Sequence, residues 1–288
     1  MSAAGASAPS ARRLGRGPSL LLIAPLLAVV LVAFVLPLLL LLHESLFVPS
    51  PTFKHYARLF GEPLYLRVIG RTFRIAAIVT AATLLLAYPL AWLMTRAKGW
   101  VLAVLVACVL LPLWTSVLVR TYAWTVLLQR NGVINQLLMQ AGAIDAPVKL
   151  LYTEAAVVAA MTHVLLPFMV LPLWSALRAI PKDLLQAAAL LGATPVRTFR
   201  EVVWPLSLPG VSSGCLMVFL LSLGFFVTPM LIGGPQQMMV ATLISQQVRE
   251  LLNWPFAGAL VGFLLAVTLA LVLAFNRAVR LERFVGSR

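Results

Sequence analysis

The sequence predicts an all-α integral membrane protein with six transmembrane helices, and three observations support this fold class: its composition, its mean hydropathy and the length of its apolar runs. Hydrophobic residues make up 62% of the 288 residues, charged residues only 10%, and the mean hydropathy is +1.01. Soluble globular domains are usually about half apolar and a quarter charged. A chain of this composition therefore requires lipid as the solvent for most of its surface.

The third observation is the length of the apolar runs. A hydrocarbon core about 30 Å thick needs about 20 helical residues to cross it, and six runs reach that length. None of the six contains Asp, Glu, Lys or Arg. The predicted spans are Leu20–Leu42, Ile75–Met94, Trp100–Val119, Ala155–Leu177, Val211–Ile232 and Phe256–Phe275.

The segments around the spans define the predicted organisation of the chain. The first span is too long for the core of a secretory signal and no small-residue cleavage site follows it, so it is expected to stay in place. The predicted units are a flexible tail (1–19), the first span (20–42), an extracytoplasmic loop (43–74), a five-helix core (75–275) with a cytoplasmic loop (178–210), and a C-terminal tail (276–288).

Basic residues are unevenly distributed between the two sides. An even number of spans puts both termini on one side, and the segments there hold 13 of the 22 Lys and Arg residues in about 70 residues, against nine in about 90 on the other side. The positive-inside rule therefore places both termini in the cytoplasm. Nucleic-acid binding is not expected, because the basic residues lie in short tracts between apolar runs and not on one face of a soluble module.

Two shorter patterns concern packing. Apolar residues recur at helical spacing over residues 239–252 and predict a short amphipathic helix at the outer surface. Small residues in the last two spans are expected to allow close contact between helices. These residues are Gly214, Gly224, Gly258 and Gly262.

The cytoplasmic loop has the pattern of two short helices. Strong helix formers run from Asp183 to Gly192, where glycine can end a helix, and Thr194-Pro195 offers an N-cap followed by proline at the first helical position. Trp204-Pro205 is predicted to stop the second helix. From the pattern alone, this hairpin could dock into a groove of another protein or lie on the membrane face.

The loop resembles the "EAA" loop of permease subunits of binding-protein-dependent ABC importers. The match rests on the order and spacing of small residues and prolines, whereas Gln186 stands where the family has glutamate and Trp204 where it has leucine. By this resemblance the residues that couple to an ATPase are Gln186, Ala187, Ala188, Gly192, Ala193, Pro195, Val202 and Pro205.

Further segments are similar to the spermidine/putrescine class of these permeases, and together they cover roughly residues 50 to 275. These segments are Leu113–Trp124, Asn131–Asn135, Leu150–Thr153, Leu165–Met169, Phe226–Pro229 and Gly233-Gly234. The resemblance implies the transmembrane domain of a type I importer in the bacterial inner membrane. It also implies two ATPase subunits, a second permease subunit, often a different homologous chain, and an extracytoplasmic substrate-binding protein as partners.

The chain itself has no phosphate-binding loop, since no lysine follows a glycine anywhere in it. We therefore expect no catalytic residue, no metal site and no cofactor here, with ATP and magnesium bound by the partner ATPase. An ion-coupled secondary transporter is a rival interpretation, but the only ionisable side chain expected within a span is that of His163. A membrane-embedded enzyme would need a convergent catalytic cluster, which the sequence does not indicate.

Substrate identity is weakly encoded. Aromatic faces attract ammonium groups, so aromatic and polar residues near the span ends are candidates for the translocation pathway. Each of those residues, taken singly, is equally typical of an interfacial belt. His163 is equally typical of a packed, hydrogen-bonded histidine. The candidates are Trp114, Thr115, Ser116, Tyr122, Trp124 and His163. The other substrates left open are amino-acid-like amines, opines and ferric iron.

Overall fold

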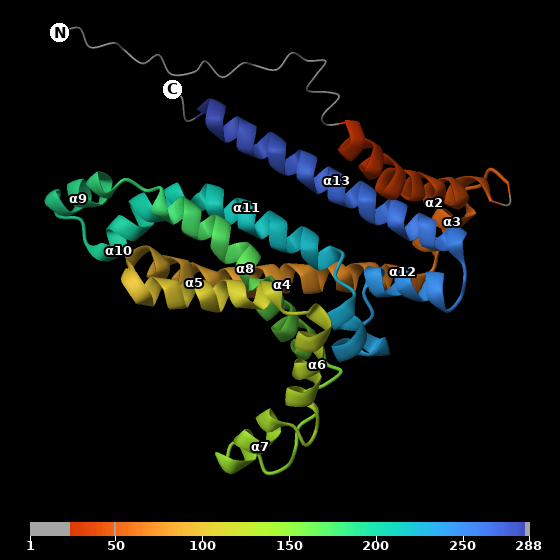
Figure 1. The fold of residues 1–288 in the computed structure, drawn as a ribbon, viewed down its shortest axis with the longest axis horizontal. Coiled ribbons are helices and arrows are strands. Elements are labelled where there is room, and N and C mark those ends of the chain that lie inside the picture. Colours follow the sequence, from red (N-terminus) through yellow and green to blue (C-terminus); the bar gives the residue numbers. More distant parts are fainter. Residues whose placement is uncertain (1–23, 49, 286–288) are drawn as a thin grey trace, which may run out of the picture.

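The computed structural model describes residues 24–48 and 50–285, with side chains up to residue 277, and this part of the chain is helical with no β-strand (Figure 1). The predicted tail 1–19 and the start of the first span lie outside the described residues. The helices are α2 (Leu36–Phe47), α3 (Lys54–Gly61), α4 (Pro63–Arg96), α5 (Gly99–Trp114), α6 (Val117–Leu128), α7 (Val133–Gln140), α8 (Glu154–Arg178), α9 (Lys182–Leu190), α10 (Pro195–Thr198), α11 (Trp204–Leu223), α12 (Val240–Arg249) and α13 (Trp254–Val285).

Five helices of the described residues are long and apolar enough to cross a membrane. They are Ala24–Phe47, Pro63–Arg96, Glu154–Arg178, Pro195–Leu223 and Trp254–Arg277. A sixth candidate is a pair of helical segments, Gly99–Trp114 and Val117–Gln140, which meet at a bend of 101°. When the bent pair is taken as one span, the structure holds the six spans that the sequence predicts.

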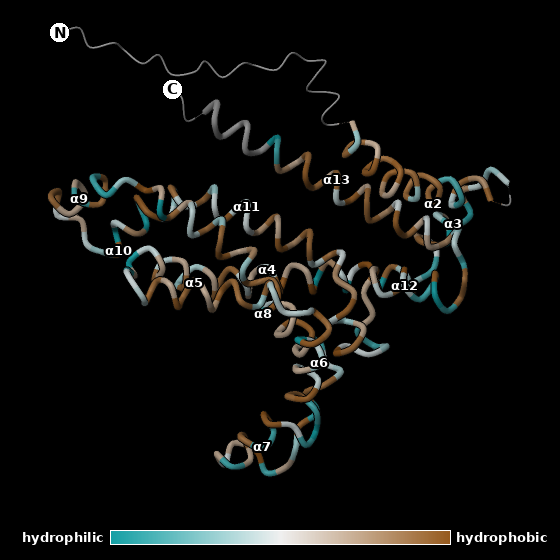
Figure 2. The backbone as a smooth tube through the Cα atoms, viewed as in Figure 1, coloured by the Kyte–Doolittle hydropathy of each residue, from teal (hydrophilic) through white to brown (hydrophobic). Residues whose placement is uncertain are grey.

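Helix α8 lies in the middle of the bundle, where it packs against α4 and α11, and α4 and α11 also contact each other. Helix α13 packs against α2 beside this group (Figure 1). Helices α9 and α10 lie at one end of the long helices, called here the α9 end, and α3 and α12 lie at the other, called the α12 end (Figure 1). Hydrophobic residues follow the long helices and hydrophilic ones gather at the ends and in the connections (Figure 2).

Glycines set the closest approaches between helices. A Cβ atom at Gly214 would lie 2.7 Å from Sδ of Met169, and one at Gly210 would lie 2.5 Å from Cβ of Ala176, so α11 touches α8 through its glycines. A Cβ atom at Gly258 would collide with the main-chain oxygen of Leu41 on α2. Close packing is thus confirmed for three of the four predicted glycines, since Gly262 also lies against Leu42 of α2 and Tyr56 of α3.

Gly224 is the exception among the four. It forms the C-cap of α11, and a Cβ atom there would meet no other group within 4 Å. The prediction that this glycine allows close helix contact is wrong, because the helix ends at this residue and does not pass a neighbour there.

The predicted third span, Trp100–Val119, is not one helix. Helix α5 ends at Trp114, and both Thr115 (ψ 145°) and Ser116 (ψ 136°) have extended backbone conformations before α6 begins. The Thr115 hydroxyl donates to the Pro112 carbonyl at 3.0 Å. Local hydrogen bonds of hydroxyl side chains compete with the backbone hydrogen bonds of a helix and can end it. Hydropathy alone cannot detect this break, because Thr115 and Ser116 are uncharged and the run stays apolar on average.

Trp204-Pro205 does not stop a helix, contrary to the prediction. The five-residue π turn Phe199–Val203 precedes it, and the Trp204 amide bonds to the Phe199 carbonyl, so α10 continues through the π turn into α11. Proline has no backbone N–H to donate, and its ring clashes with the carbonyl group four residues earlier. A π turn widens the helix beside the proline and relieves that clash. The predicted fifth span, Val211–Ile232, is therefore displaced: the helix begins earlier and ends at Leu223, and a separate π turn covers Pro229–Gly233.

Two predicted connections also contain regular helix. The segment 43–74 holds α3 and the first turns of α4, where the Arg58–Glu62 ion pair (2.9 Å) supports α3 and Leu59 is fully buried. The segment 276–288 holds the last turns of α13, which reaches Val285. The long helices α4 and α13 extend beyond their apolar runs because helix propensity, unlike hydropathy, does not change at the hydrocarbon boundary.

The amphipathic helix predicted over residues 239–252 is present as α12. Its Val240 and Leu243 side chains are buried, and the Val240 amide donates to the Thr72 hydroxyl on α4 at 2.9 Å. Leu251 and Leu252 follow the helix and are exposed. The helix therefore lies against α4 at the α12 end through its apolar face.

The crowding at Gly258 generates a prediction about stability. Gly258→Ala should destabilise the protein by roughly 1–3 kcal/mol, because the added methyl group forces α13 away from the Leu41 carbonyl. Gly70→Ala is the matched control: Gly70 lies inside α4 with open space around its Cβ position, so the same change should stabilise by up to about 1 kcal/mol. Thermal unfolding in detergent checks this, and equal midpoints for the two variants would contradict it.

Candidate functional site

A groove of about 700 Å³ runs along one side of α8 and is called here the α8 groove. Helix α4 contributes apolar side chains to it, α6 contributes Trp124, and α8 contributes most of the rest. The lining residues are Ile78, Ala82, Leu86, Trp124, Glu154, Ala155, Val158, Ala159, Thr162, His163 and Leu166. Ala155 and Ala159 lie one turn apart on α8, and their small side chains leave room for the groove. The few polar groups of the groove lie among apolar walls, as is usual for ligand sites.

Two predicted pathway residues meet in the groove. The indole N–H of Trp124 donates to Nδ1 of His163 at 3.4 Å, and the two ring centroids are 6.0 Å apart in an edge-to-face arrangement. With Nδ1 accepting, a neutral imidazole carries its proton on Nε2. His163 therefore has both properties that the sequence left open: it is hydrogen-bonded, and it also lines the groove.

Two further polar groups of the groove were not predicted as site residues. Glu154 lies in the first turn of α8, which Thr153 caps by accepting from the Ala156 amide at 3.2 Å, and its carboxylate is ion-paired with Arg74 on α4. The Thr162 hydroxyl is buried and has no hydrogen-bond partner among the described residues. The Glu154 carboxylate and the Thr162 hydroxyl are oxygen acceptors, the type of group to which an ammonium group donates.

The remaining pathway candidates lie outside the α8 groove. Trp114, Thr115 and Ser116 form the bend between α5 and α6, and Tyr122 lies on α6. Trp114 is 85% exposed and Tyr122 is 70% exposed, so both project from this chain. Adjacency in sequence suggested one group, but the bend of the backbone separates Trp114, Thr115 and Ser116 from Trp124. Tyr122 shares α6 with Trp124 and is exposed on the helix, outside the groove lining.

Arg120 is a residue that the sequence reasoning missed. It lies on α6, and its Nε and Nη1 atoms are buried with no hydrogen-bond partner among the described residues. The neighbouring Thr121 anchors α6, because its hydroxyl lies 3.1 Å from that of Thr228. The apolar run ends at Val119, so the sequence places Arg120 just outside a span. A buried guanidinium is costly without acceptors, and the described residues offer it none.

The turn between α9 and α10 has a defined hydrogen-bond pattern. Gly192 has φ +76°, its amide bonds to the Ala189 carbonyl, and the Ala193 amide bonds to the Ala188 carbonyl, both at 3.0 Å. This is the Schellman motif, with glycine at the position that needs positive φ. The Thr194 hydroxyl then accepts from the Arg197 amide at 3.4 Å, with Pro195 as the first residue of α10. The helix, glycine turn and capped helix predicted from the sequence are therefore confirmed.

This turn presents apolar side chains to the outside. Leu190 is 89% exposed, Leu191 87% and Val196 76%, and they surround Gly192 at the tip of the α9 end. We call Leu190, Leu191 and Val196 the apolar tip. The apolar tip is therefore a candidate interaction surface.

The residues of the predicted coupling set are distributed along this region. Gln186 and Ala187 are exposed on α9 and Ala188 is half-buried, while Gly192, Ala193 and Pro195 form the turn into α10. Val202 is half-buried in the π turn, and Pro205 is exposed in the first turn of α11. Val202 and Pro205 thus lie outside the α9–α10 turn, and a continuous helix joins them to the apolar tip.

Comparison with known proteins identifies relatives of the whole core. Residues 87–282 match the family described as binding-protein-dependent transport system inner membrane component. The chain is 36% identical over 231 residues to the spermidine/putrescine transport system permease protein PotB of Escherichia coli (strain K12), with 80% of this chain and 83% of that one covered. It is 37% identical over 239 residues to the protein of the same name from Haemophilus influenzae (strain ATCC 51907 / DSM 11121 / KW20 / Rd), with 80% and 83% covered.

The fold is similar to that of a solved transporter. The crystal structure of a bacterial alginate ABC transporter, in complex with its alginate pentasaccharide-bound periplasmic protein, has a chain that matches with a TM-score of 0.72 at 19% identity. The match covers 91% of this chain and 94% of that chain, so the likeness extends over the full transmembrane domain. The chain belongs to the family of inner membrane components of binding-protein-dependent transport systems, and it has the type I ABC permease fold.

Proposed function

We propose that this chain is the permease subunit of an ATP-driven importer that carries polyamines such as spermidine and putrescine into the bacterial cytoplasm. The identity of 36–37% with two spermidine/putrescine permeases, over 80% of the chain, is the observation that carries the substrate class. As a membrane component, the chain moves the substrate and leaves ATP hydrolysis, with its magnesium, to two separate ATPase subunits.

The α8 groove supplies chemistry that suits a polyamine. The Trp124 ring can attract an ammonium group through its π face, and the apolar wall from α4 can cover the methylene segments. The Glu154 carboxylate can accept from an ammonium group that competes with Arg74 for it. A passing diamine or triamine thus finds one aromatic face from α6 and one carboxylate from α8 in the same groove.

The α9 end is proposed to couple the permease to the ATPase. The apolar tip is exposed in this chain, and a groove on a partner would bury it at a gain of about 25 cal/mol per Å² of apolar surface. Its rigid Schellman turn and the continuous helix through Val202 and Pro205 let a displacement of the tip reach α11. Gln186 carries no charge and acts through shape in this proposal.

A second permease subunit and a substrate-binding protein complete the proposed assembly. The guanidinium of Arg120 needs acceptors that the described residues do not supply, and Trp114 and Tyr122 project from the same part of the chain. A neighbouring permease on this side would supply those acceptors and enclose the α8 groove. The binding protein would then deliver substrate at the α12 end.

The first prediction concerns transport. Trp124→Ala should raise the substrate concentration for half-maximal spermidine uptake by about 2- to 30-fold, because the cation–π attraction that is lost corresponds to roughly 0.5–2 kcal/mol. The assay uses proteoliposomes of the assembled importer with ATP in the lumen, binding protein outside and no ion gradient. Trp100→Ala, an exposed tryptophan outside the groove, is the control. Uptake driven by an ion gradient without ATP would refute the importer mechanism.

The second prediction concerns coupling. Gly192→Val should leave membrane insertion intact but reduce the stimulation of ATPase activity by loaded binding protein several-fold. No group lies within 4 Å of a Cβ atom at this position, so the effect comes from the backbone: a β-branched residue at φ +76° is strained by roughly 1–3 kcal/mol and favours a different turn. ATPase turnover of matched amounts of assembled complex is the measurement.

Two controls separate strain from coupling in that experiment. Gly192→Asn should retain most of the stimulation, since asparagine tolerates the left-handed conformation. Gly142→Val places the same strain (φ +69°) in a second Schellman turn, after α7 and away from α9, and should leave the ATPase coupling intact. Normal stimulation in Gly192→Val would show that the α9–α10 turn is a passive hairpin.

The third prediction concerns orientation, with both termini and the α9 end in the cytoplasm. In a background where Cys108 and Cys215 are replaced, Asp145→Cys should react with a membrane-impermeant maleimide added to intact right-side-out cells. Arg200→Cys, which is exposed at the α9 end, should react only after the membrane is opened. Labelling of Arg200→Cys in sealed cells would reverse the proposed topology.

A further inference from the structure

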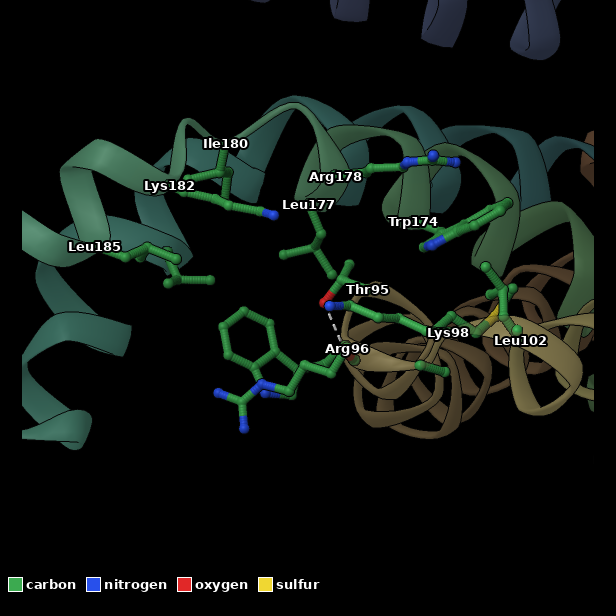
Figure 3. A pocket seen from close by; sticks show the side chains of 15 residues that line it. Thr95, Arg96, Lys98, Leu102, Trp174, Leu177, Arg178, Ile180, Lys182 and Leu185 are labelled. Carbon is green, nitrogen blue, oxygen red and sulfur yellow. Dashed lines mark hydrogen bonds between the residues drawn. The ribbon is translucent and has the colours of Figure 1, made fainter.

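A second cavity, of about 680 Å³, lies at the α9 end between the α4–α5 connection, the last turn of α8, and α9 (Figure 3). We call it the basic cavity, because its lining includes Arg96, Lys98, Arg178 and Lys182 and no acidic residue. It is distinct from the α8 groove and shares no lining residue with it. Neither the proposed transport pathway nor the apolar tip accounts for it.

The four cations have no carboxylate partner within ion-pair distance among the described residues. The two arginines lie over tryptophan rings, Arg96 at 4.7 Å from the Trp92 centroid and Arg178 at 5.6 Å from the Trp174 centroid. The two lysines extend into the cavity from different elements, Lys98 from the α4–α5 connection and Lys182 from α9 (Figure 3). Their ammonium groups are therefore available to an anion inside the cavity.

Uncharged donors are available at the same place. Helix α5 begins at Gly99 in the cavity wall with no side-chain hydrogen bond to cap it, so its first amides and the positive end of its dipole favour an anion. The indole N–H of Trp174 is buried and has no hydrogen-bond partner among the described residues. By contrast, the Thr95 hydroxyl already donates to the Trp92 carbonyl at 2.7 Å. A phosphate group at the start of α5 would satisfy the uncapped first amides of that helix.

The rest of the lining is apolar and favours a lipid phosphate over a free one. Leu102, Leu177, Ile180 and Leu185 form the wall beside the cations. Helix α5 then continues away from the cavity with exposed apolar side chains, including Val101 and Val104, along which acyl chains can lie. Trp92 and Trp174 are the residue type that sits at the headgroup level of a bilayer.

We propose that the basic cavity binds the headgroup of an anionic phospholipid, with its phosphate between Lys98, Lys182 and the N-terminus of α5. Basic pockets between transmembrane helices on the cytoplasmic side are suited to such headgroups. A bound lipid would join the α4–α5 connection to α9, the element proposed to couple to the ATPase. The acidic side chains of an ATPase are a different occupant, and the apolar walls together with the exposed apolar face of α5 favour the lipid.

The test is native mass spectrometry of the assembled importer, ATPases included, titrated with phosphatidylglycerol. The wild-type complex should bind the lipid saturably and much more tightly than phosphatidylethanolamine. Lys98→Ala/Lys182→Ala should weaken phosphatidylglycerol binding about 25-fold, because each lysine contributes a factor of about five at an anionic headgroup. Lys98→Arg/Lys182→Arg, which keeps both charges, should bind within a few-fold of wild type. The masses in the same spectra show that each variant is assembled.

The matched control removes two other cations from the same end. Arg200→Ala/Arg277→Ala changes exposed residues outside the cavity and should leave phosphatidylglycerol affinity within about twofold of wild type. Equal weakening in both double variants would overturn the proposal, since the lipid would then respond only to overall charge. Two further results would also overturn it: inorganic phosphate competing as tightly as the lipid, or lipid binding that occurs only after the ATPases are removed.

Discussion

Helix α8 can lie between α4 and α11 only because the facing surfaces have small residues. In lipid there is no hydrophobic force that draws two apolar helices together, so association depends on close van der Waals contact and on a few polar bonds. Gly210 and Gly214 bring α11 onto Ala176, Pro172 and Met169 of α8 at distances that a side chain would not allow. As a result α8 has the largest buried share among the candidate spans.

The two regions that we propose for substrate passage and for coupling lie at opposite ends of this buried helix. Glu154 and His163 lie in its first half and line the α8 groove, while Arg178 ends the helix three residues before α9 begins. From His163 to Arg178 the axis is about 23 Å long at 1.5 Å per residue. Pro167 and Pro172 lie in this stretch, and each removes a backbone hydrogen bond. In the proposed importer, a displacement of α9 therefore reaches the groove through a helix that can bend at two defined places.

Two further prolines show how long helices are kept continuous in this chain. The π turn Leu31–Val35 precedes Pro37 by two residues, and the π turn Phe199–Val203 precedes Pro205 by the same interval. In each case the wider turn accommodates the proline, which has no amide N–H to donate and whose ring needs space beside the carbonyl groups of the preceding turn. A proline after a π turn thus keeps the helix continuous, whereas α5 ends at Trp114, before the extended residues Thr115 and Ser116.

The sequence by itself determined the all-α membrane fold, the number of spans with the bent pair taken as one, and the Gly192 turn. These properties follow from local quantities: the apolar length needed to cross a bilayer, and the backbone conformation that glycine allows. Only the tertiary structure decided that Trp124 meets His163, and that Nε and Nη1 of Arg120 are buried with no partner among the described residues. Only it, too, brought Lys98 and Lys182 to the same cavity. Such contacts join helices that are distant in sequence. They depend on the bend after Trp114 and on the close contacts between the glycines of α11 and α8. Neither feature alters the hydropathy profile, so the sequence pattern alone does not indicate them.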